Sequence, residues 1–170
     1  MDLKSKIRVI EDFPHEGISF KDITTLMQDG VAFKEAIKQM AEPFYGQQVD
    51  VVVGPEARGF LIGTPLAYEL TSGFVPVRKS GKLPYEVVEA NYELEYGNDT
   101  LQIHKDAIKP GDKVIVADDL LATGGTVKST VDLVKELGGE VIGVTFLIEL
   151  TYLNGRDKLK GYDIKSLITY

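Results

Sequence analysis

The chain has 170 residues and a formal net charge of −7, and 44% of its residues are hydrophobic. These values are typical of one soluble domain, and the acidic balance argues against nucleic-acid binding, which needs a basic surface. The sequence has no cysteine, which rules out disulfides, thiolate nucleophiles and cysteine zinc sites. Because we find no signal peptide and no apolar run of membrane-spanning length, we expect a cytoplasmic protein that contacts no membrane.

The first part of the chain is predicted to form two helices joined by an irregular stretch. Apolar residues recur at intervals of three and four over residues 2–11 and 30–45, which predicts one helix in each range. Residues 12–29 contain proline and glycine and are predicted to be irregular.

The rest of the chain alternates between apolar strand-like runs and helical patterns. Continuous runs of the kind found in strands buried on both faces occupy residues 51–53, 74–77, 114–117 and 141–148. Helices are expected over residues 59–70 and 124–137. This alternation predicts a single α/β domain over residues 1–170, with a Rossmann-like, mostly parallel central sheet flanked by helices.

Residues 80–105 interrupt this alternation. They are polar and rich in tyrosine and glutamate, and they contain Gly81, Pro84 and Gly97. We interpret them as an antiparallel hairpin or mobile flap that stands off the sheet, because long insertions between sheet strands often act as lids.

The strongest functional signal is a buried strand followed by two carboxylates and a glycine-rich turn. Asp118 and Asp119 follow the strand at 114–117, at the sheet edge where ligands bind in open parallel sheets. The turn that opens the next helix consists of Ala122, Thr123, Gly124, Gly125 and Thr126. Such a helix N-terminus offers free N–H groups to a phosphate, and carboxylates accept hydrogen bonds from a vicinal diol. A phosphate next to a diol describes ribose 5-phosphate.

Two other interpretations of this motif carry less weight. An ordinary helix cap after an acidic turn would not need both aspartates next to a buried strand. A nucleotide hydrolase would need a Gly-x-x-x-x-Gly-Lys-Ser/Thr loop, and the sequence contains none.

Basic residues follow the first two strands. Residues 54–59 form a glycine-containing loop in which Arg58 can hold paired phosphate oxygens. Arg78, Lys79 and Lys82 concentrate positive charge directly after the second strand. Each group also fits an ordinary solvent-exposed surface, but the nearby phosphate turn favours a polyanion site.

The motif at residues 118–126 resembles the phosphoribosyl pyrophosphate motif of type I phosphoribosyltransferases, in the form found in adenine phosphoribosyltransferases. Further segments fall in the same order as in that family, at residues 13–14, 17, 20–23, 54–60, 78–79, 81–84, 94–97 and 155–159. Agreement of several separate segments in order is far more specific than one motif.

The resemblance implies the type I phosphoribosyltransferase fold, with a flexible hairpin flap over about residues 80–105 and a small N-terminal base-binding hood over about residues 12–29. It implies purine salvage, in which the 5-phosphoribosyl group of phosphoribosyl pyrophosphate is transferred to adenine to give AMP and pyrophosphate. It also implies Mg²⁺ bound through the substrate, with no direct protein ligand, and a homodimer.

The resemblance further implies roles for residues outside the motif. Arg58, Arg78, Lys79 and Lys82 would contact pyrophosphate, beside a cis peptide bond at Glu56–Ala57. The expected catalytic residues are Asp118, Asp119 and Glu95 of the flap, and Tyr96 would close the flap.

For the base, the resemblance implies that Phe20 stacks on the purine ring and that Leu150 closes the other face. Backbone groups of Ser19 and Lys21 would read the edge of the base. Family members often carry arginine at the Lys21 position, so only the backbone role is carried over to lysine.

Two alternative functions stay open. The enzyme could use another base, such as xanthine, hypoxanthine or orotate, or the chain could be a non-catalytic sensor of phosphoribosyl pyrophosphate. Such sensors usually carry a nucleic-acid-binding module, for which this chain has no spare residues. We interpret His15 and His104 as structural or exposed, and Tyr152 and Tyr162 as packing residues.

Overall fold

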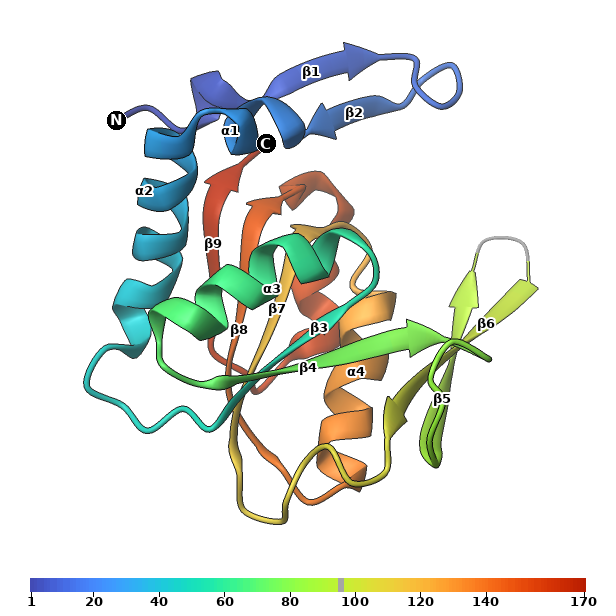
Figure 1. The fold of residues 1–170 in the computed structure, drawn as a ribbon. Coiled ribbons are helices and arrows are strands. Elements are labelled where there is room, and N and C mark those ends of the chain that lie inside the picture. Colours follow the sequence, from blue (N-terminus) through green and yellow to red (C-terminus); the bar gives the residue numbers. More distant parts are fainter. Residues whose placement is uncertain (95–96) are drawn as a thin grey trace.

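The molecule is built on one twisted β-sheet with helices on both sides (Figure 1). The computed structural model describes residues 1–94 and 97–170, which form a seven-stranded sheet in the order β5-β6-β4-β3-β7-β8-β9. The strands are β3 (Val51–Pro55), β4 (Gly73–Lys79), β5 (Val87–Leu94), β6 (Gly97–His104), β7 (Lys113–Leu121), β8 (Glu140–Glu149) and β9 (Ile164–Thr169). The α-helices are α1 (Thr24–Gln28), α2 (Gly30–Ala41), α3 (Arg58–Glu69) and α4 (Gly125–Glu136). In this described part, no helix has the length and apolar character needed to cross a membrane.

The sheet is mostly parallel, which confirms the predicted fold class. Strands β4, β3, β7, β8 and β9 run parallel to one another, and the antiparallel pairs are β4–β6 and β6–β5 at one edge. Strand β9 is missing from the sequence-based prediction. Its residues are mostly half-buried or exposed at the opposite edge, so they do not form the continuous apolar run that marks the central strands.

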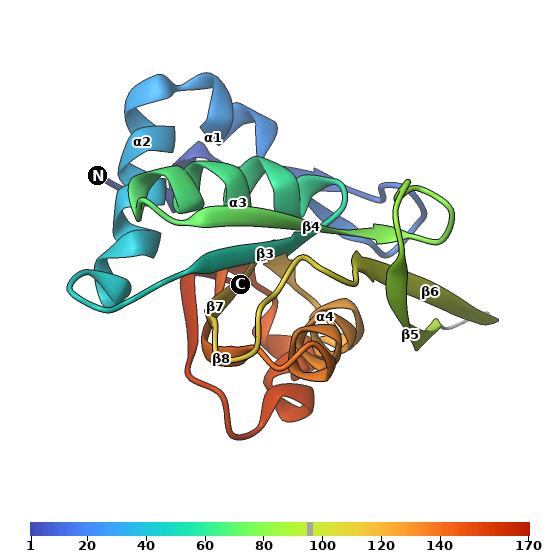
Figure 2. The same ribbon diagram turned by 60° about the horizontal axis from the view of Figure 1, so that its bottom comes forward.

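Successive residues of β7 belong to two separate hydrophobic cores. Ile115 and Ala117 pack with α2 and α3, whereas Val114 and Val116 pack with α4. Figure 2 shows α2 and α3 on one side of the sheet and α4 on the other. Because neighbouring side chains of a strand face opposite sides, a strand covered on both faces must be apolar at each position.

The N-terminal segment differs from its prediction. In place of the expected helix, a 3₁₀ turn (Lys4–Lys6) leads into β1 (Arg8–Glu11). Strand β1 pairs antiparallel with β2 (Ser19–Asp22), within a stretch predicted to be irregular. Leu3 and Ile7 are buried as expected, but the backbone conformation here is set by pairing with β2, which local spacing does not reveal.

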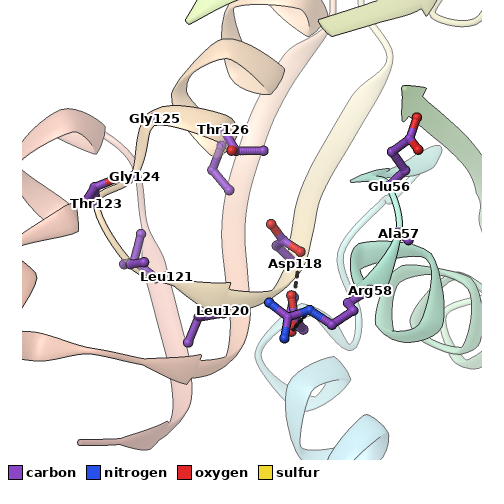
Figure 3. A pocket seen from close by; sticks show the side chains of 13 residues that line it. Glu56, Ala57, Arg58, Asp118, Leu120, Leu121, Thr123, Gly124, Gly125 and Thr126 are labelled. Carbon is purple, nitrogen blue, oxygen red and sulfur yellow. Dashed lines mark hydrogen bonds and ion pairs between the residues drawn. The ribbon is translucent and has the colours of Figure 1, made fainter. Parts of the chain in front are cut away.

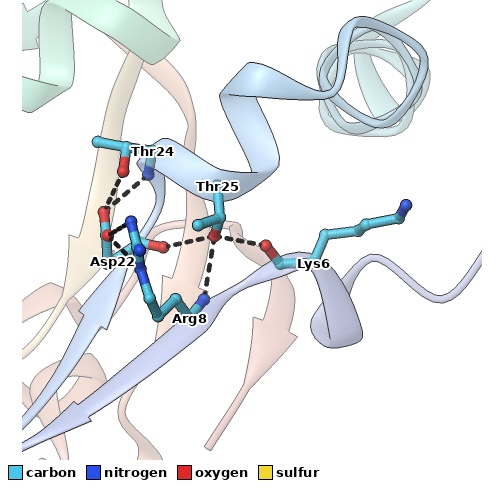
Figure 4. Close-up of polar contacts among 5 residues, drawn as sticks. All are labelled: Lys6, Arg8, Asp22, Thr24 and Thr25. Atoms are coloured by element: carbon cyan, nitrogen blue, oxygen red, sulfur yellow. Dashed lines mark hydrogen bonds and ion pairs between the residues drawn. The ribbon is translucent and has the colours of Figure 1, made fainter.

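A polar cluster fixes the β1–β2 hairpin to helix α1 (Figure 4). This hairpin, Arg8–Asp22, overlaps the predicted hood of residues 12–29, and from here on the name hood refers to the hairpin. The Arg8 guanidinium donates twice to Asp22, at 3.0 and 2.8 Å. The other oxygen of Asp22 accepts hydrogen bonds from the hydroxyl and backbone N–H of Thr24, which lower the pKa of this carboxyl. The Thr25 hydroxyl donates to the Lys6 carbonyl at 2.7 Å. The hood and α1 are therefore held as one unit.

The predicted flap is an antiparallel hairpin of β5 and β6. Its base does not stand off the sheet, because Arg78 and Lys79 of β4 pair with Gln102 and Leu101 of β6. Leu101 and Ile103 are buried in the same core as α4, so the apolar residues of β6 join the hairpin to the main body. Glu95 and Tyr96 lie outside the described residues.

Candidate active site

The two adjacent carboxylates lie near the end of β7 but within the strand. Pairing with β8 continues through Leu120 and Leu121, so the prediction that the strand stops before Asp118 is wrong. The backbone N–H of Asp119 donates to the Asp118 carboxylate at 2.8 Å. Both side chains line a cavity of about 220 Å³, which we call the acid cavity (Figure 3).

The acid pair sits in an environment that disfavours two negative charges. Asp118 is half-buried at the cavity wall, and desolvation, together with the charge of Asp119, raises its pKa well above the usual range. Burial also raises the pKa of Asp119, while the Arg58 guanidinium opposes that rise. The Arg58 Nε lies 3.1 Å from Asp119 Oδ2, a buried oxygen that accepts no hydrogen bond from the described residues. Arg58 therefore balances the charge of this enclosed oxygen.

The glycine-rich turn forms the opposite wall of the acid cavity. Gly124 has φ 88° and precedes the first residue of α4, Gly125. This left-handed conformation strains residues that have a Cβ. A glycine cannot cap the helix with a side chain, so the N–H groups of the first turn stay available to an anion.

The turn is held from behind by a second glycine. A Cβ on Gly124 would lie 2.6 Å from the Gly155 carbonyl oxygen, and one on Gly155 would lie 2.5 Å from the Ala122 carbonyl oxygen. Around Gly125, the nearest atom to an added Cβ is Lys158 Nζ at 3.9 Å. Gly124 is therefore required by backbone conformation and packing, whereas the space beside Gly125 is open.

The loop after β3 completes the acid cavity. The Glu56–Ala57 peptide bond is cis, as the resemblance implied, and α3 begins directly afterwards at Arg58. Glu56, Ala57 and Arg58 line the same cavity as residues 118–127 (Figure 3). The two candidate phosphate loops and the acid pair thus meet at one edge of the sheet, which is the arrangement that the sequence motif requires.

A second pocket, which we call the apolar pocket, adjoins the acid cavity. It has a volume of about 300 Å³, and Arg58, Leu120 and Ala122 line both spaces. Residues from distant parts of the chain complete it: Gly17, Ile18, Ser19, Phe20, Lys21, Leu150, Tyr152 and Leu153. The Arg58 guanidinium lies 5.4 Å from the centre of the Phe20 ring, within cation–π range. The structure therefore brings together all four residues predicted to bind the base.

The other predicted basic residues lie beside the acid cavity without lining it. Glu56 accepts a hydrogen bond from Arg78 Nε at 3.3 Å and from the Lys79 backbone N–H at 2.8 Å. Lys79 Nζ lies 3.6 Å from the Asp99 carboxylate. Lys82 is exposed in the loop after β4. The contacts of these three residues with pyrophosphate stay predictions.

Comparison with known proteins identifies the family. Residues 19–168 match the model of the phosphoribosyl transferase domain. An adenine phosphoribosyltransferase from Clostridium botulinum is 65% identical over 170 residues, which cover 100% of this chain and 99% of that protein. The chain belongs to the adenine phosphoribosyltransferase family.

Solved structures of the family agree with this fold. An adenine phosphoribosyltransferase from Thermoanaerobacter pseudethanolicus superimposes with a TM-score of 0.96 at 55% identity, covering 99% of this chain and 98% of that one. The Saccharomyces cerevisiae enzyme, solved with an iminoaltritol bisphosphate and adenine, gives a TM-score of 0.93 at 40% identity, with coverage of 98% and 96%. The family and fold predicted from the sequence are confirmed.

This phosphoribosyltransferase also has site residues that the sequence interpretation missed. Tyr152, predicted to be a packing residue, is 61% exposed and lines the apolar pocket with Leu153. Both belong to the 3₁₀ turn directly after Leu150, so their closeness in sequence to a predicted base contact was the available signal. Tyr162 does pack against the α4 core, and His15 is exposed, as expected.

Proposed function

We propose that this phosphoribosyltransferase transfers the 5-phosphoribosyl group of phosphoribosyl pyrophosphate to N9 of adenine and releases AMP and pyrophosphate. One observation carries the proposal: the acid cavity and the apolar pocket share the walls formed by Arg58, Leu120 and Ala122. A pentose beside the acid pair would therefore face a flat apolar ring in the adjoining pocket. This is the geometry that joining a sugar to a base requires.

Each part of phosphoribosyl pyrophosphate has a candidate partner in the site. The 5-phosphate binds the turn at residues 122–126, where α4 presents N–H groups and Thr123 and Thr126 add hydroxyl donors. The two ribose hydroxyls donate to Asp118 and Asp119. The pyrophosphate lies towards Arg58, with Arg78, Lys79 and Lys82 supplying further positive charge.

The site fits Mg²⁺ carried on the substrate. Among the described residues, no three histidine, aspartate or glutamate side chains form a metal cluster. Mg²⁺ characteristically keeps several waters and binds substrate phosphates beside one or two carboxylates, and the acid pair lines the cavity that would hold them. When bound, Mg²⁺ offsets the negative charge that develops on the leaving pyrophosphate.

The reaction exchanges one bond at the anomeric carbon for another. The N9 lone pair forms the new bond to C1 while the bond from C1 to the pyrophosphate oxygen breaks with both electrons, and the base loses its proton. Positive charge on the ribose in the transition state is stabilised by the carboxylates of Asp118 and Asp119. In this proposal, Glu95 of the flap stabilises the same charge and accepts the proton that the base loses. Tyr96 helps to close the site against water.

The apolar pocket suits a purine, with Phe20 stacking on one face of the ring and Leu150 closing the other. Backbone groups of Ser19 and Lys21 read the edge. The Lys21 ammonium is engaged elsewhere, because it donates to the Ser19 hydroxyl at 2.7 Å and lies 4.5 Å from the centre of the Tyr170 ring. Recognition by backbone groups favours adenine, whose 6-amino group needs an acceptor. The proposal includes a cytoplasmic homodimer, in line with the resemblance.

The deciding experiment measures AMP formation from adenine and phosphoribosyl pyrophosphate, with and without Mg²⁺, alongside pyrophosphate release with hypoxanthine, xanthine, guanine and orotate. We expect Mg²⁺-dependent turnover with adenine, and hypoxanthine at less than about 1% of that rate because its 6-oxo group reverses the hydrogen-bond pattern. Equal use of hypoxanthine would overturn the adenine assignment. Tight binding of phosphoribosyl pyrophosphate without turnover on any base would show that the chain is a sensor.

A further inference from the structure

A two-pronged ion pair between buried Glu149 and partly exposed Arg156, which we call the fork, closes the loop that joins β8 to the last part of the chain. Arg156 Nε donates to one carboxylate oxygen of Glu149 at 2.7 Å, and its Nη2 donates to the other at 2.8 Å. The Glu149 side chain is 7% exposed. These charge-assisted hydrogen bonds lower the pKa of Glu149 and raise that of Arg156, as expected for a matched pair.

The fork is also anchored to the edge strand β9. Arg156 Nη1 donates to the Ile164 carbonyl at 3.3 Å, and Nη2 reaches the Ser166 hydroxyl at 3.5 Å. One guanidinium therefore ties the two ends of the 149–156 loop to each other and to the sheet. Outside the fork, the backbone of this loop is held by hydrogen bonds from Leu150 N–H to the Leu121 carbonyl and from Thr151 N–H to the Tyr170 carbonyl, both at 3.0 Å.

The loop closed by the fork touches both halves of the site. At one end, Leu150, Tyr152 and Leu153 line the apolar pocket. At the other end, Gly155 packs against the carbonyl of Ala122 and against Gly124, directly behind the phosphate turn. A movement of this loop would therefore displace the wall of the base pocket and the support of the phosphate turn together.

We propose that Glu149 and Arg156 are positioning residues that hold the 149–156 loop as a common wall for both substrates. The inference rests on the proposed function, because the two spaces must hold the base and the sugar phosphate. Neither side chain lines the acid cavity or the apolar pocket, so neither needs to touch a substrate. Their effect is exerted through Leu150 at one end and Gly155 at the other.

The test compares Arg156→Lys with wild type, using steady-state kinetics for each substrate, thermal unfolding, and calorimetric binding of AMP. Lysine keeps the positive charge but cannot form the two-pronged contact. We expect the KM for adenine and the KM for phosphoribosyl pyrophosphate each to rise about tenfold, and AMP binding to weaken by about the same factor or more. The control is Lys165→Gln, which removes the ion pair of 3.2 Å with Asp163 next to the same strand and should leave both KM values unchanged.

The outcomes separate positioning from simple loss of stability. A variant with a lower melting temperature and unchanged KM values would overturn the inference, since instability reduces the amount of active enzyme and leaves its affinity intact. A change in only one KM would also overturn it. If Arg156→Lys does not fold, the double variant Glu149→Gln/Arg156→Gln removes both charges and should fold, with both KM values still raised. Failure of wild type to form AMP would instead reject the proposed function.

Discussion

The acid cavity and the apolar pocket share a wall but are built in different ways. The acid cavity comes almost entirely from two continuous segments, residues 56–58 and 118–127, and its shape is set by backbone conformation and buried charge. The apolar pocket is assembled from the hood and from the 150–153 turn, which are far apart in the sequence. We therefore expect changes in the acid cavity to affect the reaction rate or the fold, and changes in the apolar pocket to affect mainly the affinity for the base.

The largest expected effect is that of Asp119→Ala on the reaction rate. Removing one preorganised carboxylate next to the developing positive charge should lower kcat by about 10²–10³-fold. The fold should survive, because burial raises the pKa of Asp119 and so disfavours its charge. The measurement is AMP formation at saturating substrate, with thermal unfolding as the check on folding. Asp132→Asn, which alters an exposed ion pair with Lys128 on α4, is the control and should be fully active. Full activity of Asp119→Ala would exclude its contact with the ribose.

The next largest effect is expected for Gly124→Ala, which tests whether backbone geometry sets the phosphate turn. The added Cβ would meet the Gly155 carbonyl oxygen at 2.6 Å, at a residue with φ 88°. We expect the KM for phosphoribosyl pyrophosphate to rise about 30-fold and the protein to lose about 1–3 kcal/mol of stability. Gly125→Ala is the matched control for stability, because the nearest atom to its Cβ would be at 3.9 Å. Equal melting temperatures for the two variants would contradict the packing argument.

A smaller effect, confined to the base, is expected for Phe20→Leu in the apolar pocket. Leucine keeps the apolar character but loses the flat face for stacking, so the KM for adenine should rise about tenfold. The KM for phosphoribosyl pyrophosphate should change by less than about twofold. Val31→Ala removes an exposed apolar side chain on α2, away from both spaces, and serves as the control. Equal changes in both KM values would show that the apolar pocket does not affect adenine binding independently of phosphoribosyl pyrophosphate binding.

The same difference explains which parts of the site the sequence could predict. The β7 strand, the acid pair and the phosphate turn are contiguous, and each residue type reflects a local physical demand, such as burial on both faces or φ above zero at Gly124. The mostly parallel sheet around them follows from alternating strands and helices, whereas the order of its strands was not predicted. The contacts of Ser19, Phe20, Lys21 and Leu150 came only from family resemblance, since nothing local in the sequence places these residues together.

The errors have one physical cause. The conformation of β1, the pairing of β6 with β4 and the exposure of Tyr152 all depend on partners distant in the sequence. Apolar residues that recur every three to four positions over a ten-residue stretch cannot show that β1 will pair with β2. Edge strand β9 was missed for a similar reason, because pairing with β8 on one side stabilises it without a fully apolar sequence.

The smallest expected effect is a gain of stability in Asp118→Asn. This variant tests how much the acid pair lowers the free energy of unfolding. Desolvation and the charge of Asp119 raise the pKa of Asp118, so the free folded protein holds this proton to higher pH than the unfolded chain, which releases it above about pH 4. The folded state then binds more protons, and stability falls as the pH rises from that value. Asparagine cannot ionise, so the variant should be more stable than wild type at pH 7, and the gain should vanish below about pH 4.

Thermal unfolding between pH 3.5 and 8 checks this sign, and Asp50→Asn provides a control of the opposite sign. Asp50 accepts a hydrogen bond from the Lys113 backbone N–H at 2.7 Å, which lowers its pKa. Its stabilising contribution is therefore present above the pKa of the unfolded chain and is lost as the pH falls through the folded value. Asp50→Asn should lower the melting temperature at pH 7, whereas Asp118→Asn should raise it. A lower melting temperature for Asp118→Asn at pH 7 would mean that its charge stabilises the fold, and the acid cavity would then carry no cost in stability.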